Sequence, residues 1–333
     1  MKKKKNLPIF LIIFVIGIVL AIAGCFVQGQ YMGRVLVLMA INAILGSSIN
    51  LLAGFSGQIS LAHAAFYGLG AYTTAILTQK VGMSFWVALP ASFLIAAAFG
   101  VLLGIPTLKL KGHYLTIATL AFNMIIYLLI KNWDSLTNGT VGMFGIPVPT
   151  IFEVALNTPN KMLPFVIIIC TLIVAFIVSL LRSSYGRAFA AIKVDEISAE
   201  VSGVSTYYYK VLLFAISSGI AGMAGCLYAS YNQFITPESF TLNASIKILT
   251  ICVVGGIGTI IGPLVGTGFI SLVSEYFRNF ADLEQVIYGA MLVIVIVLMP
   301  KGIYPTVLGW CRKTADNVKK MKLSRKAITQ ETE

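Results

Sequence analysis

The sequence predicts an all-α polytopic membrane protein with about ten transmembrane segments and with both termini in the cytoplasm. Three observations support this prediction. The 333 residues are 58% hydrophobic and only 11% charged, whereas a soluble domain carries about 25% charged residues. Apolar runs near the roughly 20 residues that a helix needs to cross the hydrocarbon core recur along the chain. The basic residues gather at the ends of these runs, as the positive-inside rule expects of cytoplasmic loops.

The predicted transmembrane segments follow one another with mostly short connections. They fall at residues 7–27, 34–53, 62–79, 85–107, 114–130, 162–182, 210–233, 244–262, 264–280 and 284–299. The first resembles a signal peptide, but its apolar run is longer than a signal h-region and lacks a convincing cleavage site, so a transmembrane helix is favoured. Some segments are short or broken by glycine. Eight crossings with two re-entrant or broken elements are therefore the alternative, and they preserve the same sidedness.

The positive charges indicate the orientation. With Lys2–Lys5 inside, Lys109, Lys111, the loop 183–209 and the tail after Pro300 lie on the cytoplasmic side, and together they hold most of the 24 Lys and Arg residues. The net charge of +12 is therefore explained by orientation in the membrane and by contact with anionic lipid. A nucleic-acid partner is not predicted, since no basic stripe is interleaved with aromatic residues.

One domain accounts for most of the chain. Residues 1–305 are predicted to form a single transmembrane domain with a cytoplasmic loop at about 183–209, and residues 306–333 to form a basic cytoplasmic tail. The longest outer loop, about 132–160, is rich in Asn, Gly, Thr and Pro, a composition that favours turns over a regular element.

The segment Arg182–Lys210 is a charged island between two apolar blocks. Four aliphatic residues in it recur at helical spacing: Val194, Ile197, Val201 and Val204. The other side of the same helix holds Asp195, Glu196, Ala199, Glu200 and Gly203. This pattern predicts a short amphipathic helix with an acidic stripe, which we interpret as the attachment point for a soluble partner. The alternative is an ordinary interfacial helix with Gly203 as its C-terminal cap.

Two apolar segments, one in each half of the chain, are interrupted by glycine and polar residues. The first, 52–72, contains Gly54, Ser56, Gly57, Gln58, Ser60 and His63, and the second, 253–268, contains Gly255, Gly256, Gly258 and Gly262. Paired interruptions of this kind indicate a transport pathway, because unwound backbone at membrane depth must line water or be buried in protein. These residues are therefore the candidate substrate pathway. Close helix packing through small residues is the alternative, above all for the second segment.

Two ionisable residues within apolar runs are open to two interpretations. His63 is either a hydrogen-bonded structural residue or part of the pathway, and no carboxylate lies near it in sequence to form a proton relay. Lys247 is either a functional intramembrane lysine or a side chain that reaches the interface from near the outer end of its segment.

Enzymatic chemistry has no obvious site in the sequence. There is no GxxxxGK[ST] phosphate-binding loop, no GxSxG motif and no His/Asp/Glu cluster with metal-ligand spacing, and the five cysteines are scattered singly. We therefore predict no catalytic residue, no metal site and no cofactor bound by this chain. If ATP powers its function, another chain must bind the nucleotide.

Several stretches resemble, in order, the M-type permease subunits of branched-chain amino acid ABC transporters. They are GFSGQISLAHAAFYGLGAY at 54–72, KGHYLTIATLAF at 111–122, NWDSLTNGTVGMFGIP at 132–147, SYGRAFAAIKVDEISAEVSGV at 184–204, TPESF at 236–240, VVGGIGTIIGP at 253–263 and MPKGIY at 299–304. Together they span nearly the whole chain from about residue 35 to residue 305.

The resemblance implies one subunit of a larger importer in a bacterial cytoplasmic membrane, working by alternating access. It implies a second, H-type permease, two cytoplasmic ATPase subunits that bind ATP and magnesium, and an extracytoplasmic binding protein that delivers leucine, isoleucine or valine. The loop 183–209 then corresponds to the ATPase-coupling loop of ABC permeases, whose general pattern is Glu-Ala-Ala-x-x-x-Gly. This chain has Ile197-Ser198-Ala199 and then Gly203, so the leading Glu is displaced to Glu196 or Glu200.

Two other functions fit the same architecture. Urea permeases resemble this family closely, so urea, a short amide or another small solute is the alternative substrate. A secondary carrier or channel that works without ATPases is the alternative class, and the scarcity of carboxylates in the apolar segments argues against it.

Overall fold

The computed structural model describes residues 7–25, 29–107, 112–151, 154–277 and 302–310, together with isolated residues between 286 and 299. These parts of the chain are mostly helical. The helices of the bundle are α1 (Leu7–Cys25), α2 (Gln30–Phe55), α3 (His63–Ala75) with the π-helix η1 (Ile76–Lys80), α4 (Phe85–Thr107), α5 (His113–Asn132), α7 (Pro159–Arg182), α10 (Thr206–Asn232), α11 (Leu242–Gly255) and α12 (Gly262–Tyr276).

These helices confirm the predicted polytopic helical membrane protein. Each apolar segment predicted between residues 7 and 280 contains one of them. Within the described residues, α2, α4, α5, α7 and α10 are long and apolar enough to cross a membrane, whereas α3, α11 and α12 have only 13, 14 and 15 residues. The predicted segment 284–299, Lys109, Lys111 and most of the tail lie outside the described residues, so the number of crossings stays a prediction.

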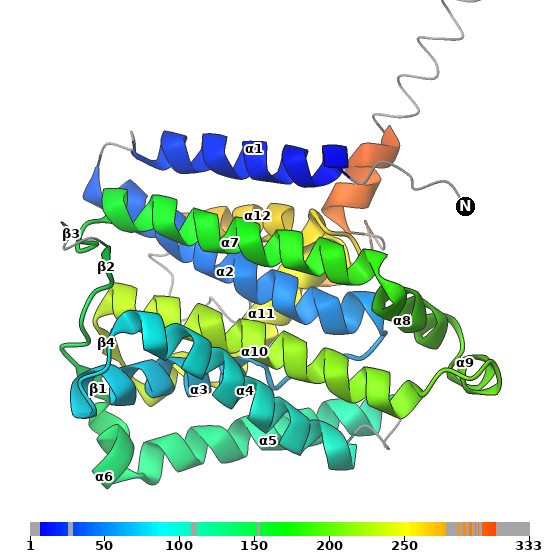
Figure 1. Cartoon of the computed structure of the whole chain (residues 1–333), viewed down its shortest axis with the longest axis horizontal. Helices are drawn as coiled ribbons and strands as arrows, with labels where there is room; N and C mark the ends of the chain where they lie inside the picture. The colour runs from blue at the N-terminus through cyan, green and yellow to red at the C-terminus, as the bar shows by residue number, and fades with distance from the viewer. Residues whose placement is uncertain are drawn as a thin grey trace, which may run out of the picture.

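The long helices of the bundle lie mostly along one direction, which is horizontal in Figure 1. The start of α1, the helices α8 (Ser184–Val194) and α9 (Glu196–Val201), and a helix at 303–310 gather at the right-hand end of that view. Short strands and α6 (Asp134–Thr137) lie at the left-hand end. The loop 183–209 is therefore on the opposite side of the bundle from the loop 132–160, as the order of the predicted segments requires. Which end faces the cytoplasm stays a prediction.

The loop 132–160 consists largely of turns, as its composition predicts, with very short regular elements. Besides α6 these are the 3₁₀ helix η2 (Gly139–Val141) and the strands β1 (Met143–Phe144), β2 (Thr150–Ile151) and β3 (Val154–Ala155). β1 pairs antiparallel with β4 (Phe234–Ile235), placing Met143 opposite Ile235, and β2 pairs with β3. Because β4 follows α10 after one residue, the first pairing joins the loop 132–160 to the end of α10. A 3₁₀ helix, η3 (Pro237–Phe240), then leads into α11.

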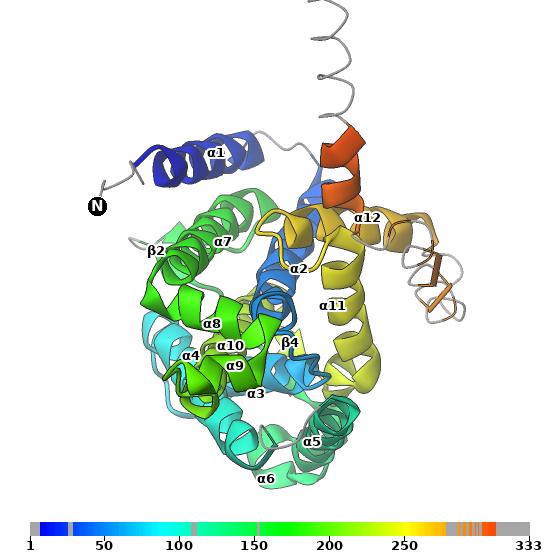
Figure 2. The same ribbon diagram turned by 90° about the vertical axis from the view of Figure 1, so that its right-hand side faces the viewer.

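The core is built around α10, which contacts α4, α3 and α2 and is seen nearly end-on in Figure 2. Glycines permit the closest of these contacts. A Cβ atom on Gly225 would lie 2.1 Å from the carbonyl oxygen of Tyr67 on α3, and one on Gly222 would lie 2.5 Å from the carbonyl oxygen of Ser92 on α4. Small residues let helix backbones approach closely, which is how helices associate where lipid is as apolar as their side chains.

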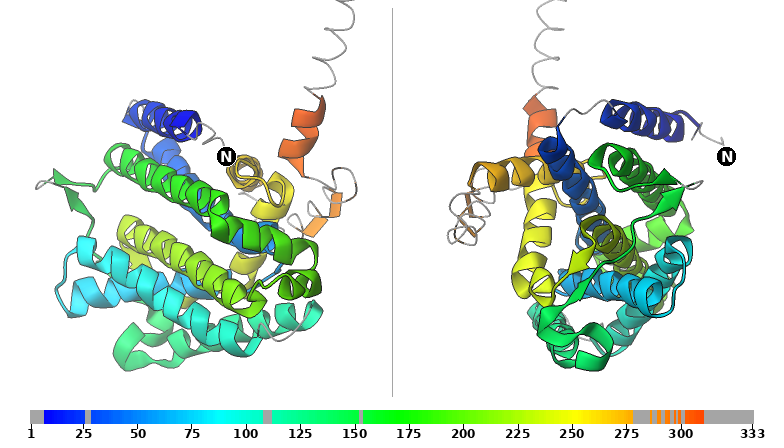
Figure 3. Two further views of the ribbon diagram at one scale, coloured as in Figure 1. Left: turned by 45° about the vertical axis from the view of Figure 1, so that its right-hand side comes forward. Right: turned by 90° about the vertical axis from the view of Figure 1, so that its left-hand side faces the viewer.

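The outer surface of the bundle is apolar. α1 lies on the outside against α7, as Figure 3 shows. Its exposed side chains include Ile16, Val19 and Ile22, and α4 and α5 expose Leu102 and Ile117. In a membrane these side chains contact hydrocarbon, so their exposure has no unfavourable hydration cost.

The close contact of Gly222 with α4 predicts that no larger side chain fits at position 222. Gly222→Leu should displace α4 from α10 and prevent stable folding, and Gly222→Ala should lower the free energy of unfolding by about 1–3 kcal/mol, the usual cost of overpacking. Thermal unfolding of the purified protein in detergent measures both. Gly309→Ala is the matched control, since a Cβ atom there would have no neighbour within 4 Å. Equal losses at positions 222 and 309 would contradict the close packing of α10.

Candidate functional site

The first broken segment lies between α2 and α3. α2 ends at Phe55, and the chain has no regular structure until α3 begins at His63. Ser56 caps α2, because its backbone N–H and its Oγ both donate to the carbonyl oxygen of Leu52, at 3.1 and 2.8 Å. Gly57 has a φ of +73°, a conformation that an L-residue adopts only with strain. Gln58 and Ser60 are buried while Ile59 between them is 48% exposed, so alternate side chains of this segment face the interior.

Side chains from distant helices satisfy the backbone of this segment. The N–H of Leu61 donates to Thr119 Oγ1 on α5 at 3.0 Å, and the N–H of Ala64 donates to Ser245 Oγ on α11 at 3.0 Å. Thr116 Oγ1 donates to the carbonyl oxygen of Ile59 at 3.3 Å. Since lipid offers no hydrogen bonds, these hydroxyls make unwound backbone possible at this depth.

His63 belongs to a fully buried polar group that joins α3, α10 and α2. Its Nε2 lies 3.0 Å from Ser217 Oγ, and Ser217 Oγ donates to the carbonyl oxygen of Ser48 at 2.7 Å. Because Ser217 uses its one hydrogen on Ser48, it accepts from Nε2–H of His63, and Nδ1 is then an acceptor. Within the described residues neither Nδ1 of His63 nor Oε1 of Gln58 has a hydrogen-bond partner, although both atoms are buried.

The second broken segment lies between α11 and α12. α11 ends at Gly255, α12 begins at Gly262, and Gly256 and Gly258 between them have φ values of +120° and +80°. Thr259 Oγ1 closes the turn by donating to the carbonyl oxygen of Gly256 at 2.8 Å and accepting from the N–H of Gly262 at 3.0 Å. The segment is thus a compact glycine turn.

The structure brings the last turns of α2, just before the first broken segment, against the second broken segment. Asn50 on α2 donates from Nδ2 to the carbonyl oxygen of Thr259 and accepts at Oδ1 from the N–H of Gly258, both at 2.8 Å. A Cβ atom on Gly54 would lie only 2.6 Å from the nitrogen of Gly258, so glycine is required there. We call the contact of Gly54 with Gly258, held by Asn50, the glycine junction. The sequence interpretation missed Asn50, although an amide inside the apolar run 34–53 is a signal that could have identified it.

The charged island forms two helices rather than one. α8 ends at Val194, Asp195 is extended with a φ of −157°, and α9 begins at Glu196. Asp195 caps α9, because its Oδ1 accepts from the N–H of Ser198 at 2.7 Å, and this bond lowers the pKa of Asp195 from its ordinary value. Gly203, with a φ of +84°, ends α9 by donating its N–H to the carbonyl oxygen of Glu200. The single helix predicted over 194–204 is wrong, because the aspartate side chain replaces a helical backbone bond.

The acidic residues of α9 bind to the start of α10. Glu196 forms an ion pair with Lys210, and Glu200 Oε1 accepts from Thr206 Oγ1 at 2.5 Å. Ala199 is buried. In contrast, Val194, Ile197 and Val201 are 88%, 66% and 85% exposed. The apolar side chains of this surface are therefore largely exposed, while Glu196 and Glu200 help to hold α9 on the bundle.

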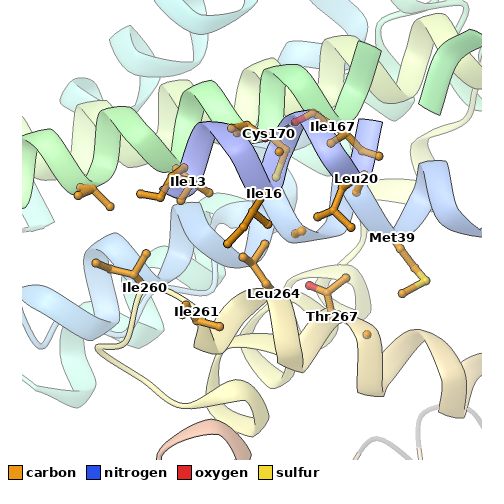
Figure 4. A pocket seen from close by; sticks show the side chains of 17 residues that line it. Ile13, Ile16, Leu20, Met39, Ile167, Cys170, Ile260, Ile261, Leu264 and Thr267 are labelled. Atoms are coloured by element: carbon orange, nitrogen blue, oxygen red, sulfur yellow. Dashed lines mark hydrogen bonds between the residues drawn. The ribbon is translucent and has the colours of Figure 1, made fainter. Parts of the chain in front are cut away.

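An apolar cavity of about 510 Å³ lies between α1, α2, α7 and α12, apart from the glycine junction. Figure 4 shows Ile13, Ile16 and Leu20 of α1 facing Leu264 of α12 across it. None of the lining side chains is charged. A zwitterionic amino acid would lose its hydration there without gaining polar partners, so this cavity does not suit it.

The remaining candidate residues are placed as follows. Lys247 lies half-buried in the first half of α11, and the structure leaves both interpretations of it open. Within the described residues, no group of three or more His, Cys, Asp or Glu side chains could hold a metal ion.

Comparison with known proteins identifies the family. Residues 31–296 match the family described as the permease component of the branched-chain amino acid transport system. The chain belongs to this family. This agrees with the M-type resemblance and with a multi-pass membrane protein. No solved structure matches the chain.

Three relatives illustrate the similarity. The chain is 34% identical over 311 residues to the high-affinity branched-chain amino acid transport system permease protein LivM of Escherichia coli K12, a match that covers 86% of this chain and 73% of LivM. It is 33% identical to LivM of Salmonella typhimurium LT2, with the same coverage. It is 25% identical over 281 residues to the permease protein LivH of the same Salmonella strain, covering 78% of this chain and 90% of LivH. All three relatives are named as permease proteins, not as enzymes.

The glycine junction predicts a specific sensitivity at Asn50. Asn50→Leu should lower the free energy of unfolding by about 1–3 kcal/mol, because it leaves the half-buried N–H of Gly258 unsatisfied. Asn50→Asp should cost less, since it can still accept from that N–H. Denaturant unfolding in detergent compares them. Asn132→Leu is the control, because the Asn132 side chain donates to the carbonyl oxygen of Leu128 in its own helix, α5. A stability of Asn50→Leu equal to that of the control would show that the junction contributes nothing.

Proposed function

We propose that this chain is the permease subunit of an ATP-driven importer that moves leucine, isoleucine or valine across a bacterial cytoplasmic membrane by alternating access. The observation that carries the proposal is the glycine junction, where the last turn of α2 meets the unwound segment between α11 and α12 beside α8. Family membership and the names of the relatives LivM and LivH support the substrate class. A separate ATPase is proposed because the sequence contains no phosphate-binding loop.

The start of α3 has groups that suit a branched-chain amino acid. The buried acceptors His63 Nδ1 and Gln58 Oε1, which have no hydrogen-bond partner among the described residues, suit the α-ammonium group. The positive end of α3 suits the carboxylate. Phe66 is fully buried near His63, and its ring centroid lies 5.6 Å from that of Phe122 and 6.0 Å from that of Phe214. These rings form an apolar surface for the branched side chain.

The proposed pathway keeps all of the candidate residues, with a division of roles. Gln58, Ser60 and His63 would contact the substrate. The others would let the backbone bend around it, and they are Gly54, Ser56, Gly57, Gly255, Gly256, Gly258 and Gly262. The glycine turn 255–262 thus serves as a hinge in this proposal, because its positive φ values require glycine.

The end of α8 and the whole of α9 are the proposed contact with the ATPases. Their exposed apolar side chains, Val194, Ile197 and Val201, form a patch next to charged residues, a pattern typical of protein interfaces. Asp195, Glu196, Ala199, Glu200 and Gly203 would shape and hold this segment rather than supply most of the contact. Two ATPases with bound ATP and magnesium, an H-type permease, and a binding protein at the loop 132–160 would complete the importer.

The proposed cycle assigns no bond-making step to this chain. ATP binding closes the two ATPases and moves α8 and α9. The bundle then rocks so that the pathway opens to the binding protein, and substrate moves inward when the ATPases reset. The partners therefore determine the direction of transport, and the permease supplies two alternating conformations.

Charges placed on the exposed patch should separate the permease from its ATPases. We expect the double substitution Ile197→Asp and Val201→Asp to weaken ATPase binding by about 100-fold or more, since burying an unpaired charge at an interface costs several kcal/mol. Co-purification and ATP-dependent uptake in proteoliposomes measure this. Val141→Asp is the control for co-purification alone, because Val141 is 66% exposed in η2 at the opposite end, in the loop proposed for the binding protein. Retained binding by the double variant would refute the docking surface.

Reconstitution distinguishes the classes of transporter. The importer should take up leucine only when the second permease, the ATPases, the binding protein and ATP are all present. Uptake of solute into liposomes that contain this chain alone would identify a secondary carrier or channel instead.

The binding protein decides the substrate. The cognate binding protein should bind leucine, isoleucine or valine in calorimetry, and the complete importer should transport the same solute. Binding of urea or a short amide, with no response to the three amino acids, would replace the proposed substrate while leaving the importer class intact.

A further inference from the structure

The last turn of α8 reaches the end of α2. Lys193, the next-to-last residue of α8, donates from Nζ to the carbonyl oxygen of Gly54 at 2.6 Å. Gly54 lies in the last turn of α2, where the carbonyl groups have no partner within the helix. The ammonium group also lies at the negative end of the helix dipole, which adds to the attraction.

The same ammonium group lies beside the second broken segment. A Cβ atom on Gly258 would lie 3.3 Å from Lys193 Nζ and 3.0 Å from the carbonyl oxygen of Gly54. Gly258 is itself held by Asn50 of α2 at 2.8 Å. One side chain from α8 therefore contacts the glycine junction from outside, at the point where the end of α2 meets the second broken segment.

Lys193 lies close in sequence to the surface that we propose for the ATPases. Only Val194 and Asp195 separate it from α9. α8 is firmly seated at its start, since a Cβ atom on Gly186 would lie 1.9 Å from the carbonyl oxygen of Leu181. Phe189, which is buried, packs edge-on against Tyr209 of α10 with ring centroids 6.1 Å apart. If α9 is displaced, the end of α8 that contains Lys193 should therefore move before the start of α8 does.

The acidic side chains near Lys193 have other partners, so its ammonium group is available for the carbonyl oxygen of Gly54. Glu196 of α9 is paired with Lys210 of α10, and Glu200 accepts from Thr206. Asp195 accepts from the N–H of Ser198. Each of these three carboxylates thus has a partner other than Lys193. The ammonium group of Lys193 binds the backbone carbonyl oxygen of Gly54 instead.

We propose that Lys193 is a positioning residue that transmits the movement of α9 to the glycine junction through the carbonyl oxygen of Gly54. This inference rests on the proposed function, which it extends by naming the link between ATPase contact and substrate pathway. When α9 moves, the ammonium group either holds the end of α2 in place or releases it. The end of α2 and the second broken segment then shift together, because Asn50 joins them.

The test measures ATP hydrolysed per substrate transported in the complete importer, reconstituted with the second permease, the ATPases and the binding protein. Lys193→Met keeps the aliphatic stem and removes the ammonium group, so this ratio should rise about tenfold, the effect of losing one charged hydrogen bond. Lys193→Arg keeps a charged donor and should restore most of the coupling. Arg187→Met is the matched control, since Arg187 of α8 bonds to Ser183 of its own helix and its loss should leave the ratio unchanged.

The outcomes separate the two proposals. If the wild-type complex shows no ATP-dependent uptake, the proposed function fails and the inference fails with it. If the wild type transports normally and Lys193→Met has the wild-type ratio, or if hydrolysis and uptake fall together with the ratio unchanged, only the inference about Lys193 is wrong. Should Lys193→Met not assemble, Lys193→Gln gives the same test, because its side chain is too short to reach the carbonyl oxygen of Gly54.

Discussion

The fold depends on one constraint, which is that lipid cannot hydrogen-bond to the backbone. In the regular helices the constraint is met within each segment. In the two broken segments it is met by side chains from elsewhere, such as Thr119 for Leu61 and Asn50 for Gly258. A few hydroxyl and amide groups consequently join segments in the interior by hydrogen bonds. Each of these groups specifies how two distant segments lie together.

The positions of the helices could be predicted because they depend on local composition. Apolar length identifies a segment that prefers lipid, and glycine and proline indicate where such a segment breaks. The partners of the broken segments could not be predicted, since Asn50 and Thr259 or His63 and Ser217 lie more than 150 residues apart. A serine or asparagine inside an apolar run looks the same in the sequence whether it satisfies unwound backbone or only fills a small space between helices.

The segment 194–204 does not form the one continuous helix that its apolar spacing predicts, and the reason is local. The spacing of Val194, Ile197 and Val201 assumes a continuous helix, but Asp195 offers its own carboxylate to the N–H of Ser198 and starts a new one. The roles of the acidic residues depended on Thr206 and Lys210, which begin the next long helix. Helical spacing therefore said nothing about which residues of this surface would remain exposed.

The length of α10 has a mechanical consequence. Its 27 residues extend about 40 Å, from the residues that hold Glu196 and Glu200 to the strand that pairs with the loop 132–160. The glycine contacts with α3 and α4, at Gly222 and Gly225, lie in its second half. If α10 tilted as one rigid rod by about 5° around that point, its start would move by about 2 Å and its end by about 1 Å in the opposite direction. Under such a tilt, a narrowing on one face of the bundle is geometrically linked to a widening on the other.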